Sequence, residues 1–127
     1  MNWPIFFAGM GAVLIILGHF SAGSRLYLKP MLQASFDDVP KKINHCVFHY
    51  VSAYLVLSAV FLLLIGTGYD NQADTSWLLK FIALNYGFFA VVQIVIAATS
   101  GIQNAIFKMF QWILFVFVAV FAWVGTY

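Results

Sequence analysis

Four long apolar segments, separated by three more polar connections, dominate this 127-residue chain. They cover about residues 3–20, 43–67, 77–99 and 105–126. A helix needs roughly 20 apolar residues to cross a bilayer, because the hydrocarbon core is about 30 Å thick and each residue rises about 1.5 Å. None of the segments alternates polar and apolar residues as barrel strands do. The pattern predicts one all-α domain over residues 1–127, a polytopic membrane protein with a four-transmembrane-helix bundle.

The amino-acid composition also indicates a membrane protein. Hydrophobic residues make up 64% of the chain and charged residues 8%, whereas soluble domains average about 45–50% and about 25%. This excludes an ordinary soluble domain and a disordered segment. Cys46 is the only cysteine, so it forms no disulfide within the chain. A net charge of +2 is too small to indicate a nucleic-acid partner.

The connection over residues 21–42 is the longest and carries most of the charge. Because Pro30 and Pro40 interrupt it, we expect a loop that is either irregular or contains a short interfacial helix between the two prolines. The connection over residues 100–104 is a tight turn. Its last residue, Asn104, has a short side-chain acceptor suited to capping the fourth helix.

The basic residues set the orientation. Five of the six fall on one side of the predicted membrane, and only Lys80 falls on the other; the five are Arg25, Lys29, Lys41, Lys42 and Lys108. An excess of Lys and Arg marks the cytoplasmic side. Both termini are therefore expected outside, which is the periplasm if the membrane is a bacterial inner membrane. The first four basic side chains are predicted to contact lipid headgroups.

Small and polar residues predict which helix faces meet. A stripe along the first span combines small residues with one histidine, and it favours close helix packing; its members are Ala8, Gly11, Ala12, Ile15, Gly18, His19 and Ala22. The intramembrane polar residues are Tyr86 and Gln93 in the third span and Gln111 in the fourth. An unpaired amide in lipid is costly, so Gln93 should bond to another helix.

All three histidines lie near the basic end. His19 ends the first span, while His45 and His49 share one face at the start of the second. Converging imidazoles are ligands for Zn, Cu, Fe or Ni, and two on different helices suit axial haem ligation. The cofactor stays unknown, metal ion or haem. The alternative is that the histidines are structural and bond to backbone, lipid phosphate or one another.

Short motifs in the first half resemble those of small, uncharacterised four-helix bacterial inner-membrane proteins. Those proteins have a His-x3-Gly element, a Pro-Leu-Leu-like element and a Trp-His pair. The matching residues here are Gly18-His19-Phe20-Ser21-Ala22-Gly23, Lys29-Pro30-Met31-Leu32 and Phe48-His49. The resemblance implies the four-span topology and a paired role for His19 and His49, and it marks Gly23 and Pro30. Ser24 stands where those proteins have an acidic residue and Phe48 where they have tryptophan.

Three functions remain open. The first is a small accessory, assembly or interaction protein, whose partner is another membrane protein or a second copy of the chain. The second is a metal- or haem-binding protein that uses His19, His45 and His49. The third is a small transporter or channel subunit in which Tyr86, Gln93 and Gln111 line a polar path. No catalytic set is evident, which favours a protein that is not an enzyme.

Overall fold

The computed structural model describes residues 1–69 and 74–127, and every regular element within these two ranges is helical. The predicted all-α class is therefore confirmed. In chain order the elements are α1 (Trp3–Gly18), the π-helix η1 (His19–Leu28), α2 (Lys29–Gln33), α3 (Asp38–Thr67), α4 (Ser76–Thr99), α5 (Ala105–Lys108) and α6 (Trp112–Val124).

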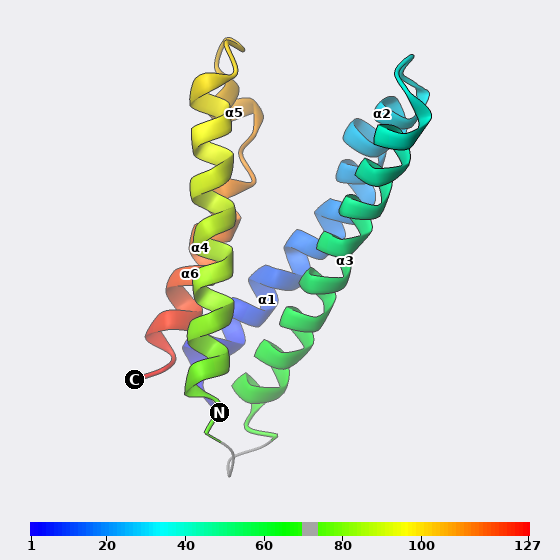
Figure 1. Ribbon diagram of the computed structural model, residues 1–127. Helices are drawn as coiled ribbons and strands as arrows, with labels where there is room; N and C mark the ends of the chain where they lie inside the picture. The colour runs from blue at the N-terminus through cyan, green and yellow to red at the C-terminus, as the bar shows by residue number, and fades with distance from the viewer. Residues whose placement is uncertain (70–73) are drawn as a thin grey trace.

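The helices form two pairs (Figure 1). α1 packs along α3, α4 packs along α6, and a contact between α1 and α6 joins the pairs. Both termini lie at the end where the pairs meet, and the pairs diverge toward the end that carries α2 and α5. The common core therefore lies near the termini.

Within the two described ranges, three helical stretches are long and apolar enough to cross a membrane: Trp3–Gln33, Asp38–Thr67 and Ser76–Thr99. They support the prediction of a membrane protein with transmembrane helices. The third predicted span, 77–99, matches α4 to within one residue. The second span ends at residue 67 as predicted, and α3 begins at residue 38 rather than 43.

The prediction that the first span ends near residue 20 is wrong. The chain stays helical to Gln33, and only residues 34–37 separate it from α3. Neither proline breaks a helix, because each lies where a helical segment begins. Pro30 lies at the start of α2, directly after the π-helix, and Pro40 lies in the first turn of α3. A first turn needs no backbone N–H donor from proline.

The predicted fourth helix over 105–126 is interrupted. α5 ends at Lys108, and α6 begins only at Trp112. The 13 residues of α6 span about 20 Å, which is short of the hydrocarbon thickness. Asn104 precedes α5 with a positive φ of 58°, and its side chain makes no capping hydrogen bond. The expected Asn104 cap is therefore absent.

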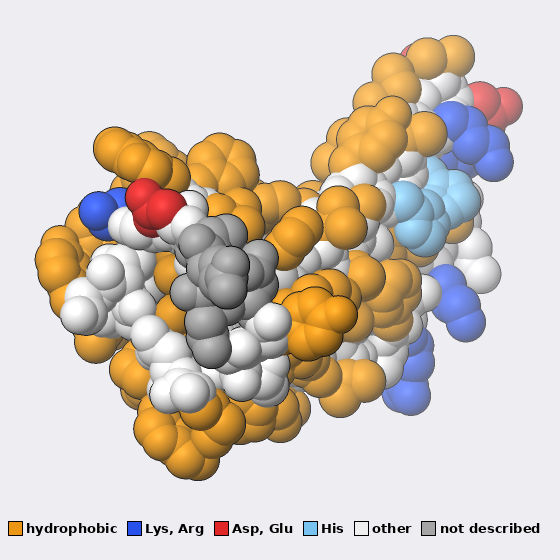
Figure 2. All heavy atoms as spheres, turned by 90° about the horizontal axis from the view of Figure 1, so that it is seen from below, with side chains coloured by type: hydrophobic (Ala, Val, Ile, Leu, Met, Phe, Trp, Pro, Cys, Tyr) orange, Lys and Arg blue, Asp and Glu red, His pale blue; other side chains and the backbone are white. Residues whose placement is uncertain are grey.

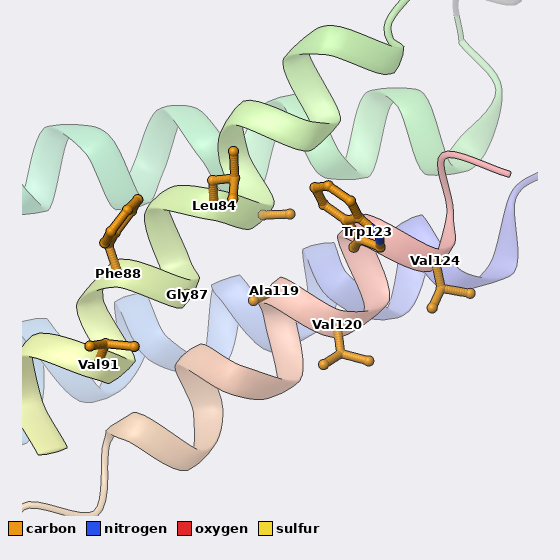
Figure 3. Close-up of a pocket in the computed structure, with 9 residues that line it drawn as sticks. Leu84, Gly87, Phe88, Val91, Ala119, Val120, Trp123 and Val124 are labelled. Carbon is orange, nitrogen blue, oxygen red and sulfur yellow. The ribbon is translucent and has the colours of Figure 1, made fainter.

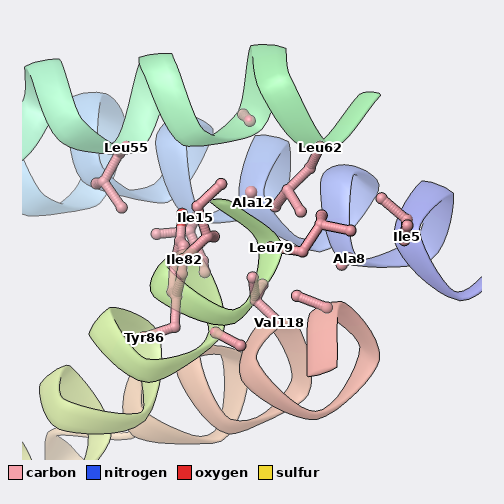
Figure 4. Close-up of a cluster of buried hydrophobic side chains, with 13 residues drawn as sticks. Ile5, Ala8, Ala12, Ile15, Leu55, Leu62, Leu79, Ile82, Tyr86 and Val118 are labelled. Atoms are coloured by element: carbon pink, nitrogen blue, oxygen red, sulfur yellow. The ribbon is translucent and has the colours of Figure 1, made fainter. Parts of the chain in front are cut away.

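The core joins α1, α3, α4 and α6 (Figure 4). Small residues of α1, among them Ala8 and Ala12, lie opposite Leu62 of α3 and Val118 of α6, and all four are fully buried. Tyr86 is also fully buried, and its hydroxyl lies 2.9 Å from Ser58 Oγ of α3. The Ser58 hydroxyl donates to the Leu55 carbonyl, so the Tyr86 hydroxyl donates to Ser58.

Glycines set the closest helix approaches. A Cβ on Gly66 would lie 2.6 Å from the Phe6 backbone nitrogen, and a Cβ on Gly11 would lie 2.8 Å from the Phe117 ring. By contrast, a Cβ on Gly18 would meet nothing within 4 Å. The predicted stripe on the first span is thus a packing face as far as Ile15. The prediction is wrong for Gly18 and Ala22, which are exposed.

Asn2 ties three helix ends together. Its side-chain oxygen accepts from the backbone N–H of Ile5 and so caps α1. Its side-chain amide donates to the Gly125 carbonyl at 2.9 Å, and its backbone N–H donates to the Gly66 carbonyl at 2.9 Å. One residue therefore fixes the start of α1 against the ends of α3 and α6.

Candidate functional site

Most basic and histidine side chains lie on one arm of the molecule. We define the basic arm as residues 19–52, which comprise η1, α2 and the first half of α3. In Figure 2 the histidine atoms form one patch bordered by Lys and Arg, at the end of the molecule that extends away from the α4–α6 pair. Within the arm η1 contacts α2, and both contact α3; η1 also contacts α1, which precedes it.

His19 is held inside the arm. Its ring stacks on Phe48 with centroids 4.0 Å apart and planes 15° apart. Its Nε2 lies 2.8 Å from Ser52 Oγ, and the Ser52 hydroxyl donates to the Phe48 carbonyl. Because a serine hydroxyl has a single proton, His19 Nε2 must be the donor. In this arrangement the nitrogen faces Ser52 and does not point at the other two histidines.

Gly23 lies close to the His19 ring. A Cβ at Gly23 would come within 3.9 Å of His19 Nδ1 and of the Phe48 ring. The π-helix begins at His19 and contains Gly23, which is buried. π-helical segments are rare and are often found at functional sites. The two residues marked by the resemblance, His19 and Gly23, are thus neighbours in space.

His45 and His49 form a second, separate pair. Their Nε2 atoms lie 3.1 Å apart on the exposed side of α3. The Phe48 ring, which stacks on His19, also meets the His49 ring edge to face with centroids 5.5 Å apart. The predicted pairing of His19 with His49 is not a direct hydrogen bond, because the two rings bond to Ser52 and His45 respectively.

The three histidines do not converge as one ligand set. Within residues 1–69 and 74–127, no group of three or more His, Cys, Asp or Glu side chains is placed to hold a metal ion. The carboxylate of Asp38, in the first turn of α3, pairs with the Lys41 ammonium at 3.7 Å. Binding of a metal ion by the remaining pair, His45 and His49, stays a prediction.

The four predicted headgroup contacts all lie on the basic arm. Arg25, Lys29 and Lys42 are exposed. Lys41 is partly covered, because its ammonium lies over the Phe36 ring at 5.4 Å as well as beside Asp38. Their placement on one arm is compatible with contact to anionic lipid, and that contact stays a prediction.

The intramembrane polar residues lie in two networks. Gln93 of α4 donates to the Gln111 side-chain oxygen at 2.6 Å, and Gln111 donates to the Tyr27 hydroxyl of η1 at 3.1 Å. The predicted bond from Gln93 to another segment is confirmed. Tyr86 is not in this network, because its hydroxyl bonds to Ser58. The side-chain oxygen of Gln93 is buried without a partner among the described residues.

The clearest pocket is an apolar groove of about 450 Å³ between α4 and α6 (Figure 3). Its lining includes the small residues Ala83, Gly87 and Ala119 and larger side chains such as Phe88 and Trp123. These residues present almost only carbon to the groove. It therefore offers space to an apolar group and no polar chemistry.

The sequence did not predict that Ser52 and Phe48 contact His19, or that Tyr27 bonds to Gln111. Ser52 follows His45 and His49 on the same face of α3, and this spacing was the available signal. No family model matches the chain, and neither does any curated protein or solved structure.

Proposed function

We propose that this chain is an interaction subunit of a membrane assembly rather than an enzyme. In this proposal α5, the break at 109–111 and α6 together make a fourth crossing. Both termini lie on the outer side, the periplasm if the membrane is a bacterial inner membrane. The excess of Lys and Arg on the basic arm supports that orientation.

The observation that carries the proposal is the basic arm. Its elements η1, α2 and α3 contact one another, and a hydrogen bond from Gln111 to Tyr27 links the arm to the segment before α6. The imidazoles of His45 and His49 lie on its surface where α3 enters the membrane. Polar groups at this depth usually face protein or water rather than lipid. A partner helix against this face would cover them.

The internal hydrogen bonds support a structural role for the other polar side chains. His19 bonds to Ser52, Tyr86 to Ser58, and Gln93 to Gln111. Each bond joins two different helical segments, as polar groups do when they hold helices together in lipid. These residues are therefore accounted for without a reaction or a transport path.

The single cysteine provides a direct test. Cys46 is exposed on α3 within the basic arm. A photoreactive maleimide attached to Cys46 in native membranes should give a discrete crosslinked product. The matched control is Cys46→Ser combined with Val92→Cys. Val92 is 53% exposed on α4 and lies seven residues before the end of that helix, as Cys46 lies eight residues after the start of α3.

The expected result is a product from Cys46 that the Val92→Cys control does not give. A product of twice the chain mass identifies a second copy as the partner, and any other discrete mass identifies a different protein. Equal labelling from both positions, or no discrete product from Cys46, would refute the proposed docking face.

A further inference from the structure

His45 and His49 direct their ring nitrogens at each other. Residues four apart on a helix lie on adjacent turns of one face. The Nε2 atoms are 3.1 Å apart, while the ring planes are inclined by 48° with centroids 5.0 Å apart. The rings therefore approach through their nitrogen atoms instead of stacking face to face.

This nitrogen separation matches a shared metal ion. Imidazole nitrogen binds Zn²⁺ at about 2.0–2.1 Å, and at that bond length the 3.1 Å separation corresponds to an angle of roughly 98° at a common ion. Such an angle lies between those of square-planar and tetrahedral coordination. We propose that His45 and His49 form a two-histidine site for a late first-row divalent ion, with Cu²⁺ the strongest binder by the general order of affinities.

Binding requires a change of tautomer but no change of charge on the rings. Without an ion, the contact is a hydrogen bond in which one Nε2–H donates to the other Nε2. A bound ion needs a lone pair on both Nε2 atoms, so the donor ring carries its proton on Nδ1 instead. The remaining coordination positions are taken by water or by a phosphate oxygen of a lipid headgroup.

The neighbouring side chains define the site as a pair rather than a larger set. His19 Nε2 lies 2.8 Å from Ser52 Oγ and is not part of the pair. Lys42 lies one turn before His45, and the carboxylate nearest along the same face, Asp38, is held by Lys41. The surroundings are cationic, so binding is best measured at physiological ionic strength, where charges about 8 Å apart or more are largely screened.

The experiment is a Cu²⁺ titration of the purified full chain in lipid nanodiscs, without a polyhistidine tag. Electron paramagnetic resonance reports the number of coordinated nitrogens. Four proteins are compared: the wild type, His49→Gln, His49→Gln with Tyr50→His, and His19→Gln. The double variant keeps three histidines but moves one off the shared face, and Tyr50 is 70% exposed.

The wild type and His19→Gln should each bind one Cu²⁺ per chain, with a two-nitrogen spectrum. Both variants that lack His49 should bind at least about tenfold more weakly, because even changes around a metal ligand cost about 10–100-fold. Equal affinity in all four proteins would overturn the proposal. So would an equally large loss in His19→Gln. The result is independent of the proposed partner, because the chain is tested alone.

Discussion

Substituting Gly66 with alanine tests the closest contact between α1 and α3. The added Cβ would lie 2.6 Å from the Phe6 backbone nitrogen and 2.8 Å from its Cα. Ordinary contact begins at 3.4 Å. The helices must therefore separate locally by about 0.8 Å, the difference between 3.4 and 2.6 Å. Because the obstructing atoms belong to the backbone, no side-chain rotation relieves the overlap.

Three terms set the size of the effect. Overpacking in a well-packed core costs about 1–3 kcal/mol. Separation of the helices also stretches the bond from the Asn2 N–H to the Gly66 carbonyl, which costs a further 0.5–1.5 kcal/mol or so. Replacing glycine with alanine inside a helix returns about 0.5–1 kcal/mol. We therefore expect Gly66→Ala to lower the free energy of unfolding by about 0.5–4 kcal/mol.

The assay is unfolding by SDS in mixed micelles, followed by tryptophan fluorescence. Gly18→Ala is the matched control, because nothing lies within 4 Å of its added Cβ and its backbone is already right-handed helical. It should leave stability unchanged or raise it by up to about 1 kcal/mol. If the two variants unfold at the same SDS fraction, the close approach of α1 and α3 is refuted.

Two further substitutions test single contacts by the same unfolding assay. Asn2→Ala removes the α1 cap and the bond to Gly125, so it should destabilise the fold by about 1–3 kcal/mol; an unchanged SDS midpoint would contradict that role. Tyr86→Phe should cost only about 0.5–1 kcal/mol, because Ser58 keeps its bond to the Leu55 carbonyl; a loss above about 2 kcal/mol would show that the hydroxyl does more than join α3 to α4.

Helical periodicity predicted α4 well and the first span only in part. In α4 the small and aromatic residues at α-helical spacing are buried, including Ala83, Tyr86 and Ala90. This agreement reflects an uninterrupted α-helix. Apolar length alone also located α3 and α4, because only a helix satisfies its backbone in lipid.

The first span departed from its pattern because the backbone changes type at His19. From Ile15 onward the inward positions are His19, Gly23 and Leu28, with His19 only partly covered. Their steps of four, four and five residues are longer than the α-helical repeat. In the π-helix the Lys29 N–H accordingly bonds to the Ser24 carbonyl, five residues back. An apolar and charged sequence does not reveal such a widened turn.

For the histidines, the sequence predicted contacts within one helix but not contacts between helices. Spacing along α3 correctly put His45 and His49 on one face. The partner of His19 depended on how two helices meet, and there Ser52 and Phe48 occupy the ring. In the fourth span, hydrophobicity could not show the break after Lys108, because Met109 and Phe110 within it are as apolar as most residues of the two helices.

The bond between Asn2 and Gly125 joins residues 123 positions apart. During synthesis, Asn2 leaves the ribosome long before Gly125 exists. The first helix therefore inserts with the side-chain amide of Asn2 still lacking this acceptor, and the ring of helix ends closes only after α6 has been made. Quality control in the cell would meet the nascent chain with this end still open. Truncation within α6 should then leave Asn2 with its bond to Gly66 but without its bond to Gly125.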